Sequence, residues 1–436
     1  MDQRFWDRHA ETLPKEDIRE IQLRRLREVV ERVYTNVGFY NTKLKALGLH
    51  PSDVSSLSDL VRLPFTTKAD IRSNYPFGLL ATPKNQVVEV HMSSGTTGVP
   101  TPNYLTLKDV ENWSEVSARS LTAAGVTRED VFQITPSLGL FTGGFGFFYG
   151  ARKIGAFIVP TGAGNTKRQV EIMRELGTTS ISAIASYLNR LTEVAHEMGV
   201  DPARDLGVRR AIIGSEPFSE EFRARMSKTW AMDIYDIPGM TETYGPGMGI
   251  DCYLHDGLHI WEDHYLIEVV DPKTGEPVTK SEERGELVVT TLTKDAMPLL
   301  RYRTGDVTYL YDDGECECGR THRRIGRISG RVDDMIKFRG VNFWPSYIES
   351  LILRHPDLSE EYVLEVTSQS GLDEMILKVE SKRILDPAER RRLENELKET
   401  INKHFYFTPT VMVVDPKTLP RVEVGKAKRF VDKRVR

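Results

Sequence analysis

A glycine-spaced run of small hydroxyl residues, Ser93-Ser94-Gly95-Thr96-Thr97-Gly98, constrains the fold of this chain most strongly. An apolar stretch at 87–90 precedes it and is typical of a strand, so the run forms a loop where a strand ends. The glycines allow backbone N–H groups to converge on one point and the hydroxyls add donors, which indicates a phosphate-binding loop. Val99 and Pro100 exclude a Walker-type loop, which requires Lys followed by Ser or Thr. An ordinary polar turn is the alternative interpretation.

Length and composition limit the class of protein. A chain of 436 residues is too long for one small core, so we expect two or three domains. The net charge is −4 with both signs interspersed, which argues against a nucleic-acid partner or a membrane surface. No apolar run approaches the roughly 20 residues of a membrane span, and the N-terminus lacks the pattern of a secretory signal. We therefore expect a cytoplasmic protein.

Short apolar runs alternate with helical patterns through much of the chain. Strand-like runs lie at 131–135, 156–160, 181–185, 210–214 and 232–237, and helical periodicity at 15–47, 167–177 and 187–199. This alternation predicts an α/β fold with a large layered N-terminal domain, residues 1–330, whose parallel sheet collects ligands at the strands' carboxyl ends. Residues 331–436 contain a strand, strand, helix, strand order, which predicts a smaller α+β C-terminal lid domain.

The cysteines indicate a metal site. Cys316 and Cys318 lie one residue apart, whereas Cys252 lies on a distant segment with His255 and His259 beyond it. Structural zinc sites use Cys₃His sets of this kind, and an odd, sparse set of cysteines argues against disulfides. We predict a structural Zn²⁺ held by Cys252, His259, Cys316 and Cys318. His255 as the fourth ligand, and plain core cysteines without a metal, are the alternatives.

Further motifs follow the hydroxyl loop in a fixed order. They are GLFTGG at 139–144, YDIPGMTETYGPG at 235–247, YRTGD at 302–306, GRVDDMIKFRGVNFWPSYIE at 330–349 and VGKAKRF at 424–430. Together with SSGTTGVPT at 93–101, they resemble the motifs of the adenylate-forming superfamily of acyl-CoA synthetases and adenylation domains. GLFTGG and FWDRHAETLP at 5–14 are similar to the phenylacetate-CoA ligase branch in particular. The resemblance covers nearly the whole chain.

The resemblance implies which residues bind ATP. The hydroxyl loop would hold the phosphates, the 214–217 loop would line the adenine and acid pockets, and Tyr235 would stack on adenine. An ionised Asp306 can accept hydrogen bonds from both ribose hydroxyls, although a turn residue is the alternative from the sequence alone. The nucleotide-binding candidates are Ser93, Ser94, Gly95, Thr96, Thr97, Gly98, Gly214, Ser215, Glu216, Pro217, Tyr235, Asp236, Asp306, Arg327 and Arg331.

The resemblance also implies the catalytic groups. Thr241 would meet the α-phosphate, and Glu242 would help to hold Mg²⁺, which prefers oxygen ligands. Lys426 would be the catalytic lysine that neutralises charge on the acid and the α-phosphate. Asp333 would be the hinge about which a mobile lid rotates. From the residues alone, the alternative for Glu242 is an ordinary surface glutamate. The alternative for Lys426 is a solvated basic tail that runs from Lys426 to Arg436.

A glycine- and aromatic-rich group of residues forms the predicted acid pocket. Glycines make room for a flat ring and phenylalanines can wall it, although close packing of a helix on the sheet is the alternative. Pro136-Ser137-Leu138 and the 183–187 segment depart from the usual residues of the phenylacetate branch, which leaves the identity of the acid open. The candidates are Phe141, Gly143, Gly144, Phe145, Ile237 and Pro238.

The predicted reaction follows from the resemblance. It is the ATP-dependent, AMP-forming ligation of an aryl acid, by default phenylacetate, to coenzyme A through an acyl-adenylate. A carboxylate is a poor electrophile, so it needs a better leaving group before a thiol attacks it, and a protein assists mostly by positioning and charge neutralisation. One alternative is an adenylating enzyme whose acceptor is an amine, a carrier protein or a deazaflavin cofactor. The other alternative is a non-catalytic nucleotide sensor. The resemblance also suggests a homodimer.

Overall fold

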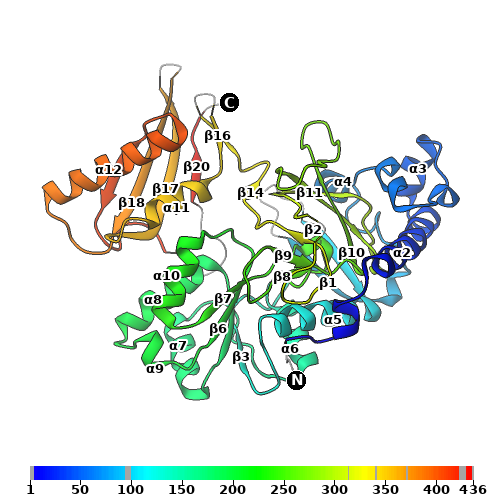
Figure 1. Ribbon diagram of the computed structural model, residues 1–436, viewed down its shortest axis with the longest axis horizontal. Coiled ribbons are helices and arrows are strands. Elements are labelled where there is room, and N and C mark those ends of the chain that lie inside the picture. The colour runs from blue at the N-terminus through cyan, green and yellow to red at the C-terminus, as the bar shows by residue number, and fades with distance from the viewer. Residues whose placement is uncertain are drawn as a thin grey trace.

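The computed structural model has a large α/β part and a smaller C-terminal part, which lies at the upper left of Figure 1. The structure describes residues 4–93, 100–312, 314–338, 341–369, 372–421 and 429–434. Within those residues, none of the helices combines the length and the apolar character needed to span a bilayer.

A five-stranded parallel sheet with the order β4-β3-β5-β6-β7 forms the framework of the large part. Its strands are β3 (Val131–Ile134), β4 (Phe157–Val159), β5 (Ser180–Ala183), β6 (Arg210–Ile213) and β7 (Asp233–Asp236). The connecting helices include α6 (Phe145–Ile154), α7 (Thr166–Leu176), α8 (Ala185–Glu197), α9 (Pro202–Asp205) and α10 (Glu220–Trp230). The predicted strands and helices of this region are all present, and their bounds differ by at most a few residues.

The remaining strands of the large part pair in antiparallel fashion. The strand before the hydroxyl loop, β1 (Val87–Ser93), pairs with β2 (Thr101–Thr106) in a separate two-stranded sheet. A three-stranded sheet contains β8 (Gly249–Asp251), β9 (Leu258–Ile260) and β13 (Arg324–Ile325). A four-stranded sheet contains β10 (Tyr265–Val270), β11 (Gly285–Thr291), β12 (Tyr302–Thr308) and β14 (Gly330–Arg331).

The helix predicted over residues 15–47 is divided into two. Helix α2 (Lys15–Asn36) ends where Val37 has an extended backbone, and α3 (Gly38–Ala46) begins at the next residue. Both Val37 and Tyr40 are buried, so the break lets the second helix fold back and bury its own apolar face. The other helices of the large part are α1 (Arg8–Glu11), α4 (Lys68–Ser73) and α5 (Leu107–Ala123).

The C-terminal part is a four-stranded sheet with the order β19-β18-β17-β20, covered by two helices. The predicted helix α12 (Pro387–Phe405) and the strands β17 (Leu358–Gln369), β18 (Leu372–Ser381) and β19 (Thr410–Val414) are present. The prediction did not include β15 (Ile336–Phe338), β16 (Val341–Phe343), α11 (Pro345–Leu353) or β20 (Phe430–Asp432). Part of the predicted basic tail is therefore a strand, because β20 pairs in parallel with the free edge of β17.

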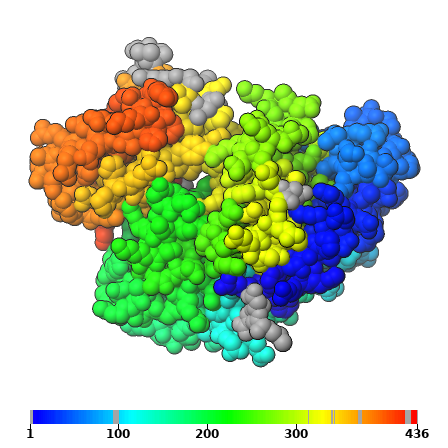
Figure 2. Space-filling model, in the orientation of Figure 1, coloured from blue at the N-terminus to red at the C-terminus, as the bar shows by residue number. Residues whose placement is uncertain are grey.

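The two parts have separate apolar cores but are in contact. Buried clusters lie around the parallel sheet, around α2 and α3, and within the C-terminal part. Helix α11 packs against α10, and its Leu353 enters the cluster that α7, α8 and α10 form with strands of the parallel sheet. Figure 2 shows the C-terminal residues, in orange, lying directly on the green residues of the large part.

A fully buried ion pair links the N-terminal segment to the segment that carries two of the cysteines. The carboxylate of Glu11 accepts hydrogen bonds from Arg320, 2.8 Å and 2.9 Å away, and both side chains are 0% exposed. Burial raises the pKa of Glu11, and Arg320 opposes that shift. The guanidinium also lies 4.5 Å above the ring of Phe5. This pair therefore holds residues far apart in the sequence together.

We expect Glu11→Ala to lower the free energy of unfolding by about 3–5 kcal/mol, because it leaves the Arg320 guanidinium buried without its counter-charge. Urea denaturation followed by circular dichroism measures the change. Arg24→Ala is the matched control, because Arg24 pairs with Glu28 on the surface and the two side chains are 63% and 62% exposed. That control should change the stability by less than about 1 kcal/mol. A similarly small effect of Glu11→Ala would contradict the assigned role.

Candidate functional site

The strand that leads into the hydroxyl loop positions one predicted phosphate ligand. Ser93 is the last residue of β1 and lies opposite Thr101 of β2. Its hydroxyl is buried and has no hydrogen-bond partner among the described residues, so it can donate to a ligand. Ser94, Gly95, Thr96, Thr97 and Gly98, together with Lys426, lie outside the described residues.

The predicted catalytic pair Thr241 and Glu242 lies in a buried 3₁₀ turn, η4 (Thr241–Thr243). The hydroxyl of Thr241 is 3.3 Å from that of Thr142, so the turn contacts the GLFTGG loop. The Glu242 carboxylate lies 3.7 Å from the Lys68 ammonium and hydrogen-bonds the Tyr302 hydroxyl. The structure therefore places a carboxylate with a cationic neighbour next to the loop that was predicted to bind the acid.

A buried lysine supports this turn from behind. Lys294 donates to the backbone carbonyl of Glu242 at 3.1 Å and to the side chain of Asn103. Burial lowers the pKa of Lys294 to about 8, although the carboxylates of Asp109 and Glu242 oppose the shift. Sequence reasoning missed Lys294 and Lys68. The available signal was a single lysine near apolar residues, and such a lysine is too common in proteins to identify a functional residue.

The predicted ribose ligand is already paired with an arginine. The Asp306 carboxylate accepts from Arg331 at 3.0 Å, and the same guanidinium donates to Asp333 at 2.9 Å. Burial alone would lower the pKa of Arg331, but the carboxylates of Asp306 and Asp333 raise it above its usual value. The predicted nucleotide arginine, ribose ligand and hinge residue thus form one connected group.

A second carboxylate–arginine pair involves Asp236 and Arg327. The Arg327 guanidinium donates to Asp236 at 3.0 Å, contacts Glu220, and lies 4.0 Å above the ring of Phe218. Burial raises the pKa of Asp236, and Arg327 opposes that shift. These contacts connect the end of β7 to the segment that follows β13.

Tyr235, the residue predicted to stack on adenine, is buried in the described structure. It lies in β7 with 6% of its surface exposed, and its ring centroid is 5.2 Å from that of His255. His255 in turn lies 3.0 Å from the carboxylate of Asp251 and contacts Arg223.

The 214–217 loop meets the end of β7. A Cβ atom on Gly214 would lie 2.7 Å from the backbone carbonyl of Ile237, so only glycine permits this approach. Ser215 has a positive φ of 71°, and Glu216 accepts from the backbone N–H of Ser186 at 2.9 Å. Segments that follow β5, β6 and β7 therefore meet at one edge of the sheet, as the parallel arrangement requires.

Phe141, Gly143, Gly144 and Phe145, four of the predicted acid-pocket residues, lie at the start of α6. A Cβ atom on Gly143 would lie 2.6 Å from the ring of Phe141, so the loop folds tightly on itself. Phe145 is the first residue of α6, and its ring centroid is 5.0 Å from that of His91 on β1. Gly144, Ile237 and Pro238, the other candidates, are buried. Sequence reasoning missed His91, whose Nε2 contacts Glu89 and whose Nδ1 is buried with no partner in the described structure.

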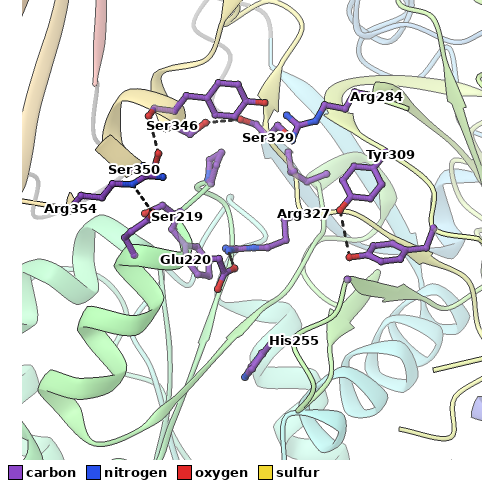
Figure 3. Close-up of a pocket in the computed structure, with 17 residues that line it drawn as sticks. Ser219, Glu220, His255, Arg284, Tyr309, Arg327, Ser329, Ser346, Ser350 and Arg354 are labelled. Carbon is purple, nitrogen blue, oxygen red and sulfur yellow. Dashed lines mark hydrogen bonds and ion pairs between the residues drawn. The ribbon is translucent and has the colours of Figure 1, made fainter. Parts of the chain in front are cut away.

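A cavity of about 530 Å³ opens between the large part and α11 (Figure 3). Arg327 and Pro217 of the predicted nucleotide site line it, together with tyrosines 309, 311 and 347. Ser346 of α11 donates to the backbone carbonyl of Ser329 at 2.8 Å across this boundary. The cavity has cationic, aromatic and hydroxyl groups on its walls, which is a suitable lining for a nucleotide.

All four predicted zinc ligands lie together in the structure. The ligand atoms of Cys252, His259, Cys316 and Cys318 are within 4.8 Å of one another, and all four residues are buried. The Cys252 and Cys316 sulfurs are 3.9 Å apart, and the Cys318 sulfur is 3.4 Å from His259 Nε2. Tetrahedral Zn²⁺ with ordinary bond lengths requires separations of about 3.5–3.8 Å, so the donor set fits this metal.

The surroundings of the four residues also suit a metal. His259 Nδ1 lies 3.3 Å from the carbonyl of His322, and a proton on that nitrogen leaves the Nε2 lone pair facing Cys318. Arg320 lies 3.7 Å from the Cys318 sulfur and can stabilise a thiolate. Hydrogen bonding to the Cys316 and Cys318 thiols, together with burial, raises the pKa of Cys252. A bound divalent cation would lower that pKa again, because it favours the thiolate.

Two family models match this sequence. One, described as AMP-binding enzyme, covers residues 27–293, and the other, described as AMP-binding enzyme C-terminal domain, covers residues 340–434. The chain belongs to the AMP-binding enzyme family.

Relatives refine this family assignment. This AMP-binding enzyme is 41% identical to the phenylacetate-coenzyme A ligase of Aromatoleum evansii, over 97% of this chain and 96% of that protein. It is also 41% identical to the phenylacetate-coenzyme A ligase of Thermus thermophilus, over 97% of this chain and 98% of that protein. Its membership of the phenylacetate-CoA ligase branch, which the motifs predicted, is confirmed.

Solved structures confirm the predicted fold class. This enzyme superposes on 2-hydroxyisobutyryl-CoA ligase in the postadenylation state, in complex with 2-HIB-AMP, with a TM-score of 0.93 and 27% identity, covering 99% of this chain and 92% of that chain. Against the same ligase in complex with CoA in the thioesterification state, the TM-score is 0.73 at 28% identity, covering 99% and 93%. Because both structures are of one ligase, the lower score reflects a different arrangement of its parts. The arrangement of the two parts in this protein is more similar to that in the postadenylation-state structure of this ligase.

The contact between the two parts encloses a carboxyl group, that of Glu349 on α11. Loss of hydration and the nearby carboxylates of Glu216 and Glu360 together raise the pKa of Glu349 to about 7, although Arg429 opposes the shift. The backbone N–H of Ser219 also favours the charged form. Because the folded pKa exceeds the ordinary value of 4.5, stability contributed by the protonated carboxyl is lost as the pH rises towards 7.

We expect Glu349→Gln to stabilise the protein by about 1–2 kcal/mol at pH 8 and to have little effect at pH 4.5, because the amide cannot ionise. Urea unfolding at the two pH values measures the difference. Glu396→Gln is the control, since Glu396 lies on α12 with 48% of its side chain exposed. An equal effect of Glu349→Gln at both pH values would contradict the prediction.

Proposed function

We propose that this protein joins an aryl acid to coenzyme A in an ATP-dependent, AMP-forming reaction. The observation that carries the proposal is the 41% identity to a phenylacetate-coenzyme A ligase over 97% of the chain. Phenylacetate is the first substrate to test, and other aryl acids follow, because residues 136–138 differ from those usual in the branch. The cytoplasmic location and the homodimer stay predictions.

In the first step, an oxygen of the acid attacks the α-phosphorus of ATP, pyrophosphate leaves, and an acyl-adenylate forms. The chain assists by positioning and by neutralising charge. The buried Ser93 hydroxyl and the hydroxyl loop after it are proposed to bind the phosphates, and Thr241 to contact the α-phosphate. The Glu242 carboxylate, a hard oxygen donor, would hold Mg²⁺, which neutralises phosphate charge when bound.

In the second step, the thiol of coenzyme A attacks the acyl carbonyl, its proton is lost to solvent, and AMP leaves. We propose that residues 331–436 form the lid and rotate about Asp333 between the steps, relative to residues 1–330. Asp333 is exposed and its only recorded side-chain partner among the described residues is Arg331, so its backbone can turn without disrupting a core. Lys426 would serve the first step and move away for the second.

The proposal predicts acid-dependent release of pyrophosphate without coenzyme A, and an acyl-CoA thioester only when coenzyme A is added. A panel of aryl acids, including phenylacetate and hydroxylated analogues, tests the reaction and its specificity together. Adenylate that transfers to an amine or to a carrier protein, but not to coenzyme A, would identify a different acceptor. Absence of acid-dependent pyrophosphate release across the panel would instead favour a nucleotide sensor.

Lys426→Ala separates the two steps of the same reaction. It should slow pyrophosphate release by at least about a hundredfold, because the charge that neutralises the acid and the phosphate is lost. Thioester formation from supplied acyl-adenylate should stay within a few-fold of the unaltered enzyme. Equal loss of both steps would contradict the role of Lys426.

We further propose that Cys252, His259, Cys316 and Cys318 bind a structural Zn²⁺. The four buried donors and the hydrogen bond from His259 Nδ1 to a backbone carbonyl support this proposal. His255 is the less suitable fourth ligand, because its Nδ1 faces Asp251.

The protein should therefore contain about one zinc ion per chain by elemental analysis. Cys318→Ser should lose the metal and unfold at a lower urea concentration, whereas His255→Ala should keep the metal. Protein that binds no zinc even after dialysis against Zn²⁺ would contradict the proposal, and so would a Cys318→Ser variant with unchanged metal content.

A further inference from the structure

One face of α8 contacts the C-terminal part close to Arg421 and Arg429, which lie on either side of Lys426 in the sequence. Asn189, Glu193 and Glu197 are spaced four residues apart, so they lie on the same side of the helix. Glu193 accepts from the Nε of Arg421 at 3.0 Å, and Asn189 donates to Glu361 at 3.1 Å. All three side chains thus face the C-terminal part, since Glu197 also contacts Lys417 there.

Arg421 is attached to both parts of the molecule at once. Besides Glu193 of α8, its guanidinium contacts Glu380 of β18, with hydrogen bonds of 2.9 Å and 2.7 Å. Glu380 is 1% exposed and also accepts the backbone N–H of Lys417 at 3.1 Å. The side chain of Arg421 is therefore held rigidly within the C-terminal part, and Glu193 is its contact on the large part.

Arg429 forms a similar connection on the other side of Lys426 in the sequence. Its guanidinium donates to one oxygen of Glu361 at 2.7 Å, while the other oxygen accepts from Asn189. Asn189 and Glu361 are buried, so this link is shielded from solvent. Residues 421 and 429, which flank Lys426 in the sequence, are thus both connected to a single helix of the large part.

We propose that Glu193 is a positioning residue for the acid-activation step, acting through Arg421, with Asn189 acting in the same way through Glu361. Because α8 belongs to the large part, these contacts can form in only one arrangement of the lid. That arrangement resembles the postadenylation state of the solved ligase. The inference rests on the proposed function, in which Lys426 serves the first step only.

The test compares Glu193→Gln, Arg421→Gln and the double variant with the unaltered full-length protein. Pyrophosphate release with acid and ATP measures the first step, and thioester formation from supplied acyl-adenylate measures the second. Glu193→Gln should slow the first step by about tenfold, the scale expected for one partly buried charge pair, and leave the second within about twofold. When Arg421 is already replaced by Gln, Glu193→Gln should slow the first step little further, because the two side chains act as a pair.

Glu197→Gln is the matched control on the same helix face. The Glu197 and Lys417 side chains are 33% and 68% exposed, so solvent screens their attraction and the variant should behave like the unaltered protein. The inference is overturned if Glu193→Gln slows both steps equally, slows neither, or retains its full effect when Arg421 is already replaced.

A substrate-free measurement separates this inference from the proposed function. If the unaltered protein activates no acid, the proposed function fails, and small-angle X-ray scattering still reports how the lid lies on α8. Glu193→Gln should then shift the scattering profile away from that of the unaltered protein. An unchanged profile would overturn the inference by itself.

Discussion

Parallel pairing of β5, β6 and β7 is the constraint on which the candidate site depends. Neighbouring parallel strands end at the same edge of a sheet, so the segments that follow them must meet there. Ser186 after β5 donates to Glu216 after β6, and Gly214 lies against Ile237 after β7. The backbone therefore brings distant residues together, and the side chains of Asp236 and Glu242 take their positions from it.

The contact between the two parts has a different physical character from the cores. Each part buries its own apolar cluster, but the contact between them is rich in ion pairs such as Arg225–Glu360, Arg421–Glu193 and Arg354–Glu221. When the two parts separate, these charged groups regain hydration, which offsets much of the attraction that is lost. Such a contact can be broken and formed again without unfolding either part, which suits an enzyme that works in two steps.

Local rules predicted the regular elements well. Pro387 occupies the first position of α12, so the start of that helix could be read from the sequence, and the structure shows that Asp386 caps it. The three-residue strand β20 could not be predicted in this way, because it has no apolar pattern of its own and depends on the free edge of β17. The break at Val37 was missed for a related reason, since it depends on what the two helices bury.

The sequence by itself determined the family, the order of the motifs and a set of three cysteines and two histidines as metal-ligand candidates, because residue type and spacing carry that information. Only the tertiary structure decided that His259 and not His255 faces the thiols, and that Lys294 and Lys68 surround Glu242. Only the tertiary structure, likewise, connected Arg421 and Arg429 to α8. The physical reason is that a charged side chain finds its partner through space, across segments whose separation along the chain leaves no local pattern to read.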